Sequence, residues 1–251
     1  MSNPHITVSD MTMAYGDFVI QKDLSFTINH GEIFIIMGGS GCGKSTLLKC
    51  LIGLKEPAQG SVSFDGTSFW SSDEDVQLEL KRKFGTLFQS SALWSSMTLA
   101  ENVALPLKQY TELGNTEINE ICSYKLALVG LAGFEDFYPS EISGGMKKRA
   151  GLARAMAMDP EILFFDEPSA GLDPISAKLL DDLILELRDS LETTVVVVTH
   201  ELSSIFEIGD NSVFLDPVSK TQLTTGNPVE LRDKSPIFEV RNFLQRGLAK
   251  D

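Results

Sequence analysis

Apolar and polar positions divide the chain into a β-rich beginning, a helical middle and a remainder in which strand and helix patterns alternate. In the first part, Ile6–Tyr15 and Phe18–Ile28 have the pattern of paired strands. The apolar run Glu32–Met37 predicts a buried strand, and a glycine-rich turn separates it from a helical pattern over Lys44–Ile52. A further strand is expected at Gly60–Phe64, where an Asp-Gly turn closes it.

The stretch at about residues 90–159 has a different pattern, in which strand signals disappear and helix starts replace them. Thr98 and Glu101 fit a capping box, in which two side chains satisfy backbone N–H groups at the start of a helix. A polar helix is also expected just before this stretch, at Asp73–Lys83. We therefore expect a helical subdomain inserted at about residues 90–159 into a larger domain.

Beyond residue 160, strand and helix patterns alternate. The expected strands are Ile162–Phe165, Thr194–Val198 and Ser212–Leu215, with helices over Ile175–Leu191 and from Leu202. This alternation predicts an α/β fold with a mostly parallel sheet covered by helices.

No internal repeat or clear linker is found, so residues 1–251 are expected to form one domain. The last expected helix, over residues 236–251, is amphipathic. Its apolar face is formed by Ile237, Val240, Phe243 and Leu244.

Composition narrows the possible partners. No apolar run approaches the roughly 20 residues that cross a bilayer, and the start of the chain, Met1–His5, does not have the pattern of a signal peptide. A membrane is therefore expected to be reached only through a partner protein. The formal net charge of −14, from 21 basic and 35 acidic side chains, disfavours nucleic acid as a partner.

Three cysteines, at positions 42, 50 and 122, make an odd number without metal-like spacing, which favours a reduced, cytoplasmic compartment. We expect Cys42 to fill a variable loop position and Cys50 to be a core residue. Alkylation of Cys42 is then expected to block nucleotide binding.

A phosphate-binding loop is predicted between the strand at Glu32–Met37 and the helix that follows. The segment satisfies the pattern G-x-x-x-x-G-K-[ST], in which glycines turn backbone N–H groups towards phosphates and the helix N-terminus points at the same anion. Lys44 is expected to reach the β- and γ-phosphates, and Ser45 to ligate Mg²⁺. A chance glycine turn is the alternative, but the strand before it and the helix after it fit the mechanism. The expected nucleotide contacts are Gly38, Gly39, Ser40, Gly41, Cys42, Gly43, Lys44, Ser45 and Thr46.

Two carboxylates follow the apolar run Ile162–Phe165 directly. Asp166 is placed to hold Mg²⁺ through water, and Glu167 to position the attacking water. His200 follows the strand Thr194–Val198, at the sheet edge where ligands of open α/β sheets bind. Solvated acids and a structural histidine are the alternatives for these residues taken singly.

With these residues in place, the segment Ile142–Met146 identifies a resemblance to the ATPase subunits of ABC transporters, and the likeness covers nearly the whole chain. This segment resembles the signature motif of that family. The resemblance implies a nucleotide-binding domain of ABC type with a mostly parallel core sheet, an antiparallel β subdomain and a helical subdomain. It also implies a head-to-tail homodimer in which each signature motif caps the nucleotide of the opposite subunit. The residues so implied are Ser143, Gly144, Gly145 and Met146.

The same resemblance assigns further roles. Tyr15 is similar in position to the aromatic residue that stacks on adenine, and Gln89 to a glutamine that touches Mg²⁺ and senses the permease. Asp173 lies in a segment, residues 169–173, that looks like the loop connecting the two sites. His200 matches the histidine that contacts the γ-phosphate. The helical subdomain is where the family docks its permease. Taken singly, a tyrosine of this kind is more often a core residue and such a glutamine a surface one.

One position departs from the family, because the signature motif usually ends in glutamine and this chain has Met146. A Ser-Gly-Gly-Met signature, with Glu101–Leu107 and Val240–Leu244, is similar to the subgroup that serves Mla phospholipid transport between bacterial membranes. That subgroup implies a peripheral protein on the cytoplasmic face of the inner membrane. Its partners would be an integral-membrane permease, a periplasmic lipid-binding subunit of Mce type and a small cytoplasmic regulatory subunit. The last helix then either crosses the dimer or folds back on its own domain.

Other functions stay open at this point. The ATPase of a small-solute ABC importer has the same chemistry but usually has glutamine at the position of Met146. A soluble ABC ATPase acting on nucleic acid or the ribosome usually has coiled-coil arms or two tandem halves, and neither is found here. A regulatory subunit that does not hydrolyse ATP is disfavoured because every catalytic position is filled.

Overall fold

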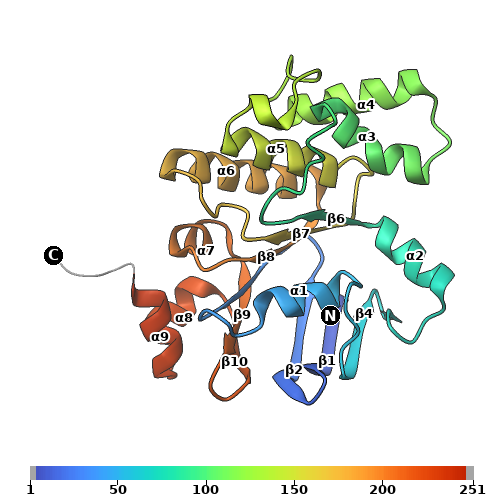
Figure 1. The fold of residues 1–251 in the computed structure, drawn as a ribbon. Coiled ribbons are helices and arrows are strands. Elements are labelled where there is room, and N and C mark those ends of the chain that lie inside the picture. The colour runs from blue at the N-terminus through green and yellow to red at the C-terminus, as the bar shows by residue number, and fades with distance from the viewer. Residues whose placement is uncertain (1–3, 247–251) are drawn as a thin grey trace.

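Two β-sheets and a layer of helices make up the chain between residues 4 and 246, the range that the computed structural model describes (Figure 1). Residues 1–3 and 247–251 lie outside that range. The first sheet is antiparallel and four-stranded, in the order β2-β1-β4-β5. Its strands are β1 (Pro4–Tyr15), β2 (Phe18–Asn29), β4 (Gln59–Phe64) and β5 (Thr67–Ser68).

The second sheet is the six-stranded core, in the order β10-β9-β3-β8-β7-β6. All of its pairs are parallel except β10 with β9. Its strands are β3 (Ile33–Gly38), β6 (Phe84–Leu87), β7 (Ile162–Asp166), β8 (Thr194–Val198), β9 (Asn211–Asp216) and β10 (Thr221–Thr225). The predicted α/β fold with a mostly parallel sheet is confirmed.

The central strand β3 shows why the sequence places a sheet in the middle of the molecule. Every residue of β3 is buried, as expected for a strand covered on both faces. Ile33, Ile35 and Met37 face the core that the helices cover, whereas Phe34 and Ile36 face the core shared with the antiparallel sheet. The two hydrophobic cores therefore lie on opposite faces of one sheet.

Helices cover the sheet and extend above it. The helices are α1 (Lys44–Leu51), α2 (Glu74–Arg82), α3 (Leu99–Tyr110), α4 (Asn115–Leu128), α5 (Gly144–Ala155), α6 (Pro174–Leu191), α7 (Leu202–Ile208), α8 (Pro228–Lys234) and α9 (Phe238–Gln245), with a short 3-10 helix at Pro139–Glu141. The capping box at the start of α3 is present, because Glu101 N–H donates to Thr98 Oγ1 at 3.2 Å and Thr98 N–H donates to Glu101 Oε2 at 2.8 Å. None of the described helices has the length and apolar character that a bilayer-crossing segment needs.

The helical subdomain lies between β6 and β7 in sequence and contains α3, α4 and α5, which form the upper layer of Figure 1. Four elements were not predicted: β5, β6, β10 and α8. Gly85 interrupts the apolar pattern of β6, and β10 is a mostly polar edge strand. Strand propensity gives little signal in either case.

Helix α9 folds back on its own chain. Val240 and Leu244 are fully buried in the core beneath the helices, and the Phe243 ring meets the Phe214 ring edge-on, with centroids 5.3 Å apart. The apolar face predicted for this helix is therefore used within the subunit. The predicted extension of the helix past residue 246 lies outside the described residues.

Candidate active site

The phosphate loop connects the end of β3 to the start of α1 through backbone angles that favour glycine. Gly38, Gly41 and Gly43 have φ values of 149°, 75° and 97°. A Cβ atom on Gly38 would lie 2.3 Å from the backbone oxygen of Leu215, which no side chain can tolerate. The loop is thus held in a shape that only this glycine spacing permits.

Lys44 lies folded over the loop at the first position of α1. Its Nζ donates to the backbone oxygens of Gly38 at 3.1 Å and Gly39 at 3.3 Å. A cation and a helix N-terminus at one turn form a site for a phosphate anion.

Two adjoining hollows open at this loop, of about 490 and 430 Å³. Both are lined by Gly41, Lys44, Glu167 and His200. The first also contains Gly38, Gly39, Ser40, Leu202, Phe243 and Arg246, and the second contains Phe18, Ile20, Gly43, Ser45, Thr46 and Gln89. The structure therefore brings together residues from both ends of the chain.

The back of the loop is fixed by a glutamine that sequence analysis did not identify. Gln21 is fully buried, and its Nε2 donates to the backbone oxygens of Cys42 at 2.7 Å and Asp216 at 2.9 Å. Cys42 is buried, and this burial raises the pKa of its thiol. No pattern in the sequence marks a buried glutamine on a strand as part of a site.

Asp166 and Ser45, two of the three expected metal ligands, lie next to each other, and Gln89 is the third. Ser45 Oγ donates to Asp166 Oδ1 at 3.3 Å. Burial raises the pKa of Asp166, the hydrogen bond from Ser45 opposes that shift, and the charge of Glu167 adds to it. Hydroxyl and carboxylate oxygens are the donors that Mg²⁺ prefers, so this pair fits such an ion.

Glu167 is held in an uncommon backbone conformation beside the hollow. Its φ is 49°, and its N–H donates to Val198 O at 2.8 Å. His200 Nδ1 lies 2.8 Å from Glu167 Oε1, while Glu167 Oε2 is buried without a hydrogen-bond partner among the described residues. A glutamate that has left-handed backbone angles and a buried carboxylate oxygen without a hydrogen-bond partner indicates a functional position.

A buried lysine ties this glutamate to Gln89. Lys148, on α5, is 6% exposed, and its Nζ donates to the backbone oxygens of Gln89 at 2.5 Å and Glu167 at 3.2 Å. Burial lowers the pKa of Lys148, and the charges of Asp166 and Glu167 oppose that shift. Sequence analysis missed this residue because its partners are backbone oxygens far away along the chain.

The signature segment lies at the start of α5 and lines neither hollow of its own chain. Ser143 caps the helix, because its Oγ accepts from Met146 N–H at 3.2 Å. Ser143 and Gly144 are exposed. Gly145 lies against Ser176, since a Cβ atom built on it would be 3.5 Å from Ser176 Oγ.

Asp173 and Tyr15 also lie outside both hollows. Asp173 caps α6 and accepts from the N–H groups of Ile175 and Ser176, and the hydrogen bonds from Ser176 lower its pKa. Tyr15 is half exposed, and Lys55 Nζ lies 4.1 Å from the centroid of its ring. Phe18, across the hairpin turn, lines the second hollow instead.

Comparison with known proteins gives a consistent result. A family model described as ABC transporter matches residues 21–170. The probable ribonucleotide transport ATP-binding protein mkl of Mycobacterium tuberculosis is 41% identical over 239 residues, which are 95% of this chain and 66% of that protein. The chain thus spans just under two thirds of the length of this relative.

A second relative is matched over most of both chains. The intermembrane phospholipid transport system ATP-binding protein MlaF of Haemophilus influenzae is 41% identical over 210 residues, covering 84% of this chain and 80% of that protein. Among solved structures, the dimeric post-hydrolysis state of the ATP-binding cassette MJ0796, bound to ADP and Pi, superposes with a TM-score of 0.80 at 29% identity. That match covers 88% of this chain and 98% of the other.

Proposed function

The chain belongs to the ABC transporter family, and from that membership we propose that it is the subunit of a membrane transporter that binds and hydrolyses ATP. The observation that carries the proposal is the buried Glu167 beside the phosphate loop, with Oε1 2.8 Å from His200 Nδ1 and Oε2 without a hydrogen-bond partner in the part of the chain that the structure describes. Phosphoryl transfer to water depends on positioning and charge rather than on covalent chemistry by the protein. A free carboxylate oxygen at the phosphate loop can supply that positioning.

Glu167 and His200 act on the attacking water in this proposal. The Glu167 carboxylate accepts a hydrogen bond from the water and takes its proton as the bond from the water oxygen to the γ-phosphorus forms and the bond from that phosphorus to the leaving ADP oxygen breaks. His200 holds Oε1, so the carboxylate cannot turn away, and the imidazole lies at the edge of the hollow where the γ-phosphate would be.

Lys44 and the loop N–H groups hold the phosphates. The Lys44 ammonium leaves the backbone oxygens of Gly38 and Gly39 when a stronger anionic partner enters. Mg²⁺ would neutralise charge on the phosphates, and Ser45 and Asp166 would hold it; Gln89 lines the second hollow together with Ser45. Phe18 and Tyr15 are the aromatic residues at this end that could meet the adenine.

Dimer formation follows from the position of the signature segment. Because Ser143, Gly144, Gly145 and Met146 line neither hollow of their own chain, we propose that they cover the nucleotide of a second copy, head to tail. The similar MJ0796 cassette was solved as a dimer with ADP and Pi, which supports this arrangement. Asp173 lies beside the signature through Ser176 and would then lie at the dimer interface.

The helical subdomain is the proposed permease dock. Several of its large apolar side chains are exposed, and we propose that they contact the permease. They are Trp94, Tyr110, Leu113, Tyr124, Phe137 and Tyr138.

We propose phospholipid as the transported substrate, in an Mla-type system on the cytoplasmic face of a bacterial inner membrane. Met146 and the segments Glu101–Leu107 and Val240–Leu244 resemble that subgroup, and the Haemophilus relative named for phospholipid transport is matched over 80% of its length. The expected partners are a permease, a periplasmic lipid-binding subunit and a small cytoplasmic regulatory subunit. The mycobacterial relative, named for ribonucleotide transport, favours a small solute as the second candidate.

Affinity purification tests the partners and the substrate. The tagged chain is isolated from native membranes in mild detergent, and co-purifying proteins and lipids are identified by mass spectrometry. Recovery of a permease, a periplasmic lipid-binding subunit and phospholipid would support the Mla-type function. A permease alone would replace phospholipid by a small solute, and recovery of no membrane protein would contradict a transporter subunit. A Trp94→Ala variant, changed at the proposed dock, should recover less permease than a Leu54→Ala variant, changed at an exposed apolar residue between α1 and β4, outside the helical subdomain.

A further inference from the structure

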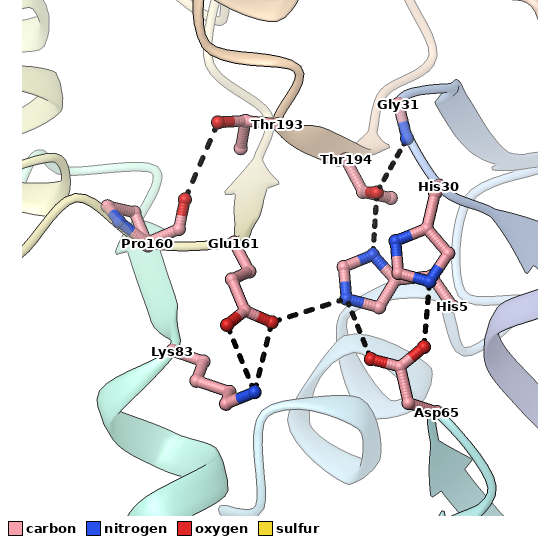
Figure 2. A network of polar contacts seen from close by, with 9 residues as sticks. All are labelled: His5, His30, Gly31, Asp65, Lys83, Pro160, Glu161, Thr193 and Thr194. Carbon is pink, nitrogen blue, oxygen red and sulfur yellow. Dashed lines mark hydrogen bonds and ion pairs between the residues drawn. The ribbon is translucent and has the colours of Figure 1, made fainter.

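The start of strand β1 and two turns of the antiparallel sheet meet beside the amino ends of β7 and β8 (Figure 2). His5 lies near the start of β1, His30 in the turn before β3 and Asp65 in the turn after β4. Glu161 directly precedes β7, and Thr194 begins β8, so the cluster lies at the amino ends of the parallel strands. Glu167 and the phosphate loop lie at the carboxyl ends, and this cluster has no part in the function proposed above.

Both imidazoles direct the same ring nitrogen at one carboxylate. The His5 and His30 rings are stacked, with centroids 3.8 Å apart and planes 12° from parallel. His30 Nε2 lies 2.7 Å from Asp65 Oδ1, and His5 Nε2 lies 3.8 Å from Asp65 Oδ2. Glu161 Oε2 is 3.9 Å from His5 Nε2, and Figure 2 marks this contact with a dashed line.

The Nδ1 atom of His5 has a hydrogen-bond partner that fixes the orientation of the ring, as is usual for a metal-binding histidine. It is 3% exposed, and its Nδ1 lies 2.7 Å from Thr194 Oγ1, which also accepts from Gly31 N–H at 2.9 Å. When Nδ1 carries the proton and donates to Thr194, Nε2 presents a lone pair to the carboxylates.

We propose that His5 Nε2, His30 Nε2 and the Asp65 carboxylate form a binding site for a divalent transition-metal cation of the zinc class. The three donor atoms all lie within 4.8 Å of one another. Imidazole and carboxylate bind Zn²⁺ at about 2.0–2.2 Å, so neighbouring donors of a tetrahedral site are about 3.3 Å apart. The present separations are 2.7 Å from His30 Nε2 to Asp65 Oδ1 and 3.8 Å from His5 Nε2 to Asp65 Oδ2, so each imidazole lies within about 0.6 Å of that spacing from one oxygen of the carboxylate.

Small movements complete the site. The parallel rings must tilt so that their lone pairs converge, and His30, which is 53% exposed on a turn, has room to do so. Glu161 or a water supplies the fourth ligand. Lys83 Nζ holds Glu161 Oε1 at 3.0 Å, so Glu161 joins the metal only by loosening that ion pair.

A bound cation would hold the three side chains of the cluster together. A divalent ion satisfies both rings and the carboxylate together. It would join β1, the turn before β3 and the turn after β4, and so stabilise the antiparallel sheet against the core.

Cobalt and zinc titrations of the tag-free, metal-stripped full chain test the site. Excess Mg²⁺ is kept present to occupy oxygen-rich sites, and Co²⁺ binding is followed by its visible ligand-field absorption and by calorimetry. We expect one equivalent of Co²⁺ per chain, displaced by Zn²⁺, and a rise in the thermal unfolding midpoint when Zn²⁺ is added.

Two cluster variants and two controls locate the ion. His30→Gln and Asp65→Asn should each weaken binding by at least about tenfold, and asparagine suits the left-handed backbone of Asp65 (φ 47°). Asp10→Asn, at another left-handed aspartate of the same sheet (φ 46°), should bind as the unchanged chain does. A signal lost in His200→Ala but kept in His30→Gln would place the metal at the nucleotide edge and overturn the proposal. Absence of stoichiometric binding would overturn it as well. None of these readings depends on ATP hydrolysis.

Discussion

Glu167 and His200 form a hydrogen-bonded pair, with His200 Nδ1 2.8 Å from Glu167 Oε1, while the other carboxylate oxygen is buried and has no hydrogen-bond partner between residues 4 and 246. Glu167 contributes this oxygen from the end of β7, and His200 follows the neighbouring strand β8. Parallel strands end at one edge, so two residues 33 positions apart meet there.

Replacing Glu167 with glutamine is expected to separate nucleotide binding from hydrolysis. The amide keeps the shape of the side chain but cannot take a proton from water, so phosphate release should fall by roughly 10²–10⁴-fold. ATP affinity should stay near that of the unchanged chain, because the phosphate loop is untouched. Phosphate release and equilibrium nucleotide binding measure the two effects. Glu201→Gln, at the exposed acid 3.7 Å from His200 Nε2, is the matched control and should keep near-normal turnover. Normal turnover in Glu167→Gln would show that another group is the base.

Lys148→Met is expected to slow hydrolysis although Lys148 lines neither hollow. The methionine fills the space of the lysine stem but leaves the backbone oxygens of Gln89 and Glu167 without their donor. An unsatisfied buried group costs about 1–3 kcal/mol, and a small displacement of Glu167 can cost on the order of 10²-fold in rate. Steady-state kinetics should show a lower kcat with little change in KM.

Lys147→Met is the control for this variant, because no side-chain hydrogen bond of Lys147 is found in the described chain. Chemical unfolding of both variants separates loss of stability from loss of rate. An unchanged kcat in Lys148→Met would remove Lys148 from the positioning of Glu167.

The sequence predicted the parts of the site that obey a local rule. The phosphate loop needs a fixed glycine spacing, and Asp166 and Glu167 directly follow an apolar strand, so both could be found by reading along the chain. Lys148 and Gln21 could not, because their partners are backbone oxygens whose distance depends on the whole fold. The same holds for His5, His30 and Asp65, which come together through the pairing of β1 with both β2 and β4.

The helices and strands likewise separate into those that a local sequence pattern predicts and those that depend on tertiary contacts. Strands such as β3 and β8 are continuous apolar runs buried on both faces, and their pattern is strong. β6 was missed because it has four residues and includes Gly85. The reason for that glycine is tertiary, since a Cβ atom there would lie 2.2 Å from Ala155 O on helix α5.

Asp181 is expected to make stability depend on pH. It is 3% exposed between α6 and α7, accepts from Ser204 Oγ at 2.7 Å, and burial raises its pKa to about 6. In the unfolded chain it ionises near its ordinary value of 3.8. Raising the pH from 4 to above 6 therefore favours the unfolded state, by on the order of 3 kcal/mol from this group.

Urea unfolding at several pH values tests this with Asp181→Asn, whose side chain cannot ionise. The unfolding free energy of the variant minus that of the unchanged chain should increase from pH 4 to pH 8, with the change centred between pH 4 and 6. Glu186→Gln, at an exposed acid of the same helix, should show no such trend. A difference independent of pH would contradict the raised pKa.

Cys42 is expected to react slowly and, once modified, to block the nucleotide site. Its burial raises the pKa of the thiol, so little thiolate is present near pH 7. A Cβ atom on Gly38 would lie 2.7 Å from Cys42 Sγ, which shows how closely the thiol packs against the loop. An added alkyl group must therefore displace the loop.

A chain with Cys50→Ala and Cys122→Ala isolates this thiol. Mass spectrometry follows its alkylation, and ATP binding is measured on the modified fraction, which should lose most of its affinity. The same chain with Cys42→Ala, treated with the reagent, should keep its affinity. Full ATP affinity after complete modification of Cys42 would contradict the prediction that an alkyl group on this thiol blocks the nucleotide site.

Ser143→Arg is expected to prevent ATP-dependent dimer formation while leaving ATP binding to the single chain intact. Ser143 caps α5, because its Oγ accepts a hydrogen bond from the Met146 N–H group at 3.2 Å. The Ser143 side chain is exposed and lines neither hollow of its own chain. An arginine there removes the cap, at about 1 kcal/mol, and places a bulky side chain over the face proposed to cover the nucleotide of a second copy.

In a Glu167→Gln background, which should accumulate the ATP-bound state, size-exclusion chromatography with light scattering should show dimer for the parent and monomer for Ser143→Arg. Ser190→Arg, at an exposed serine near the end of α6, should still dimerise. A dimer that persists in Ser143→Arg, with ATP still bound, would mean that the signature segment does not form the interface.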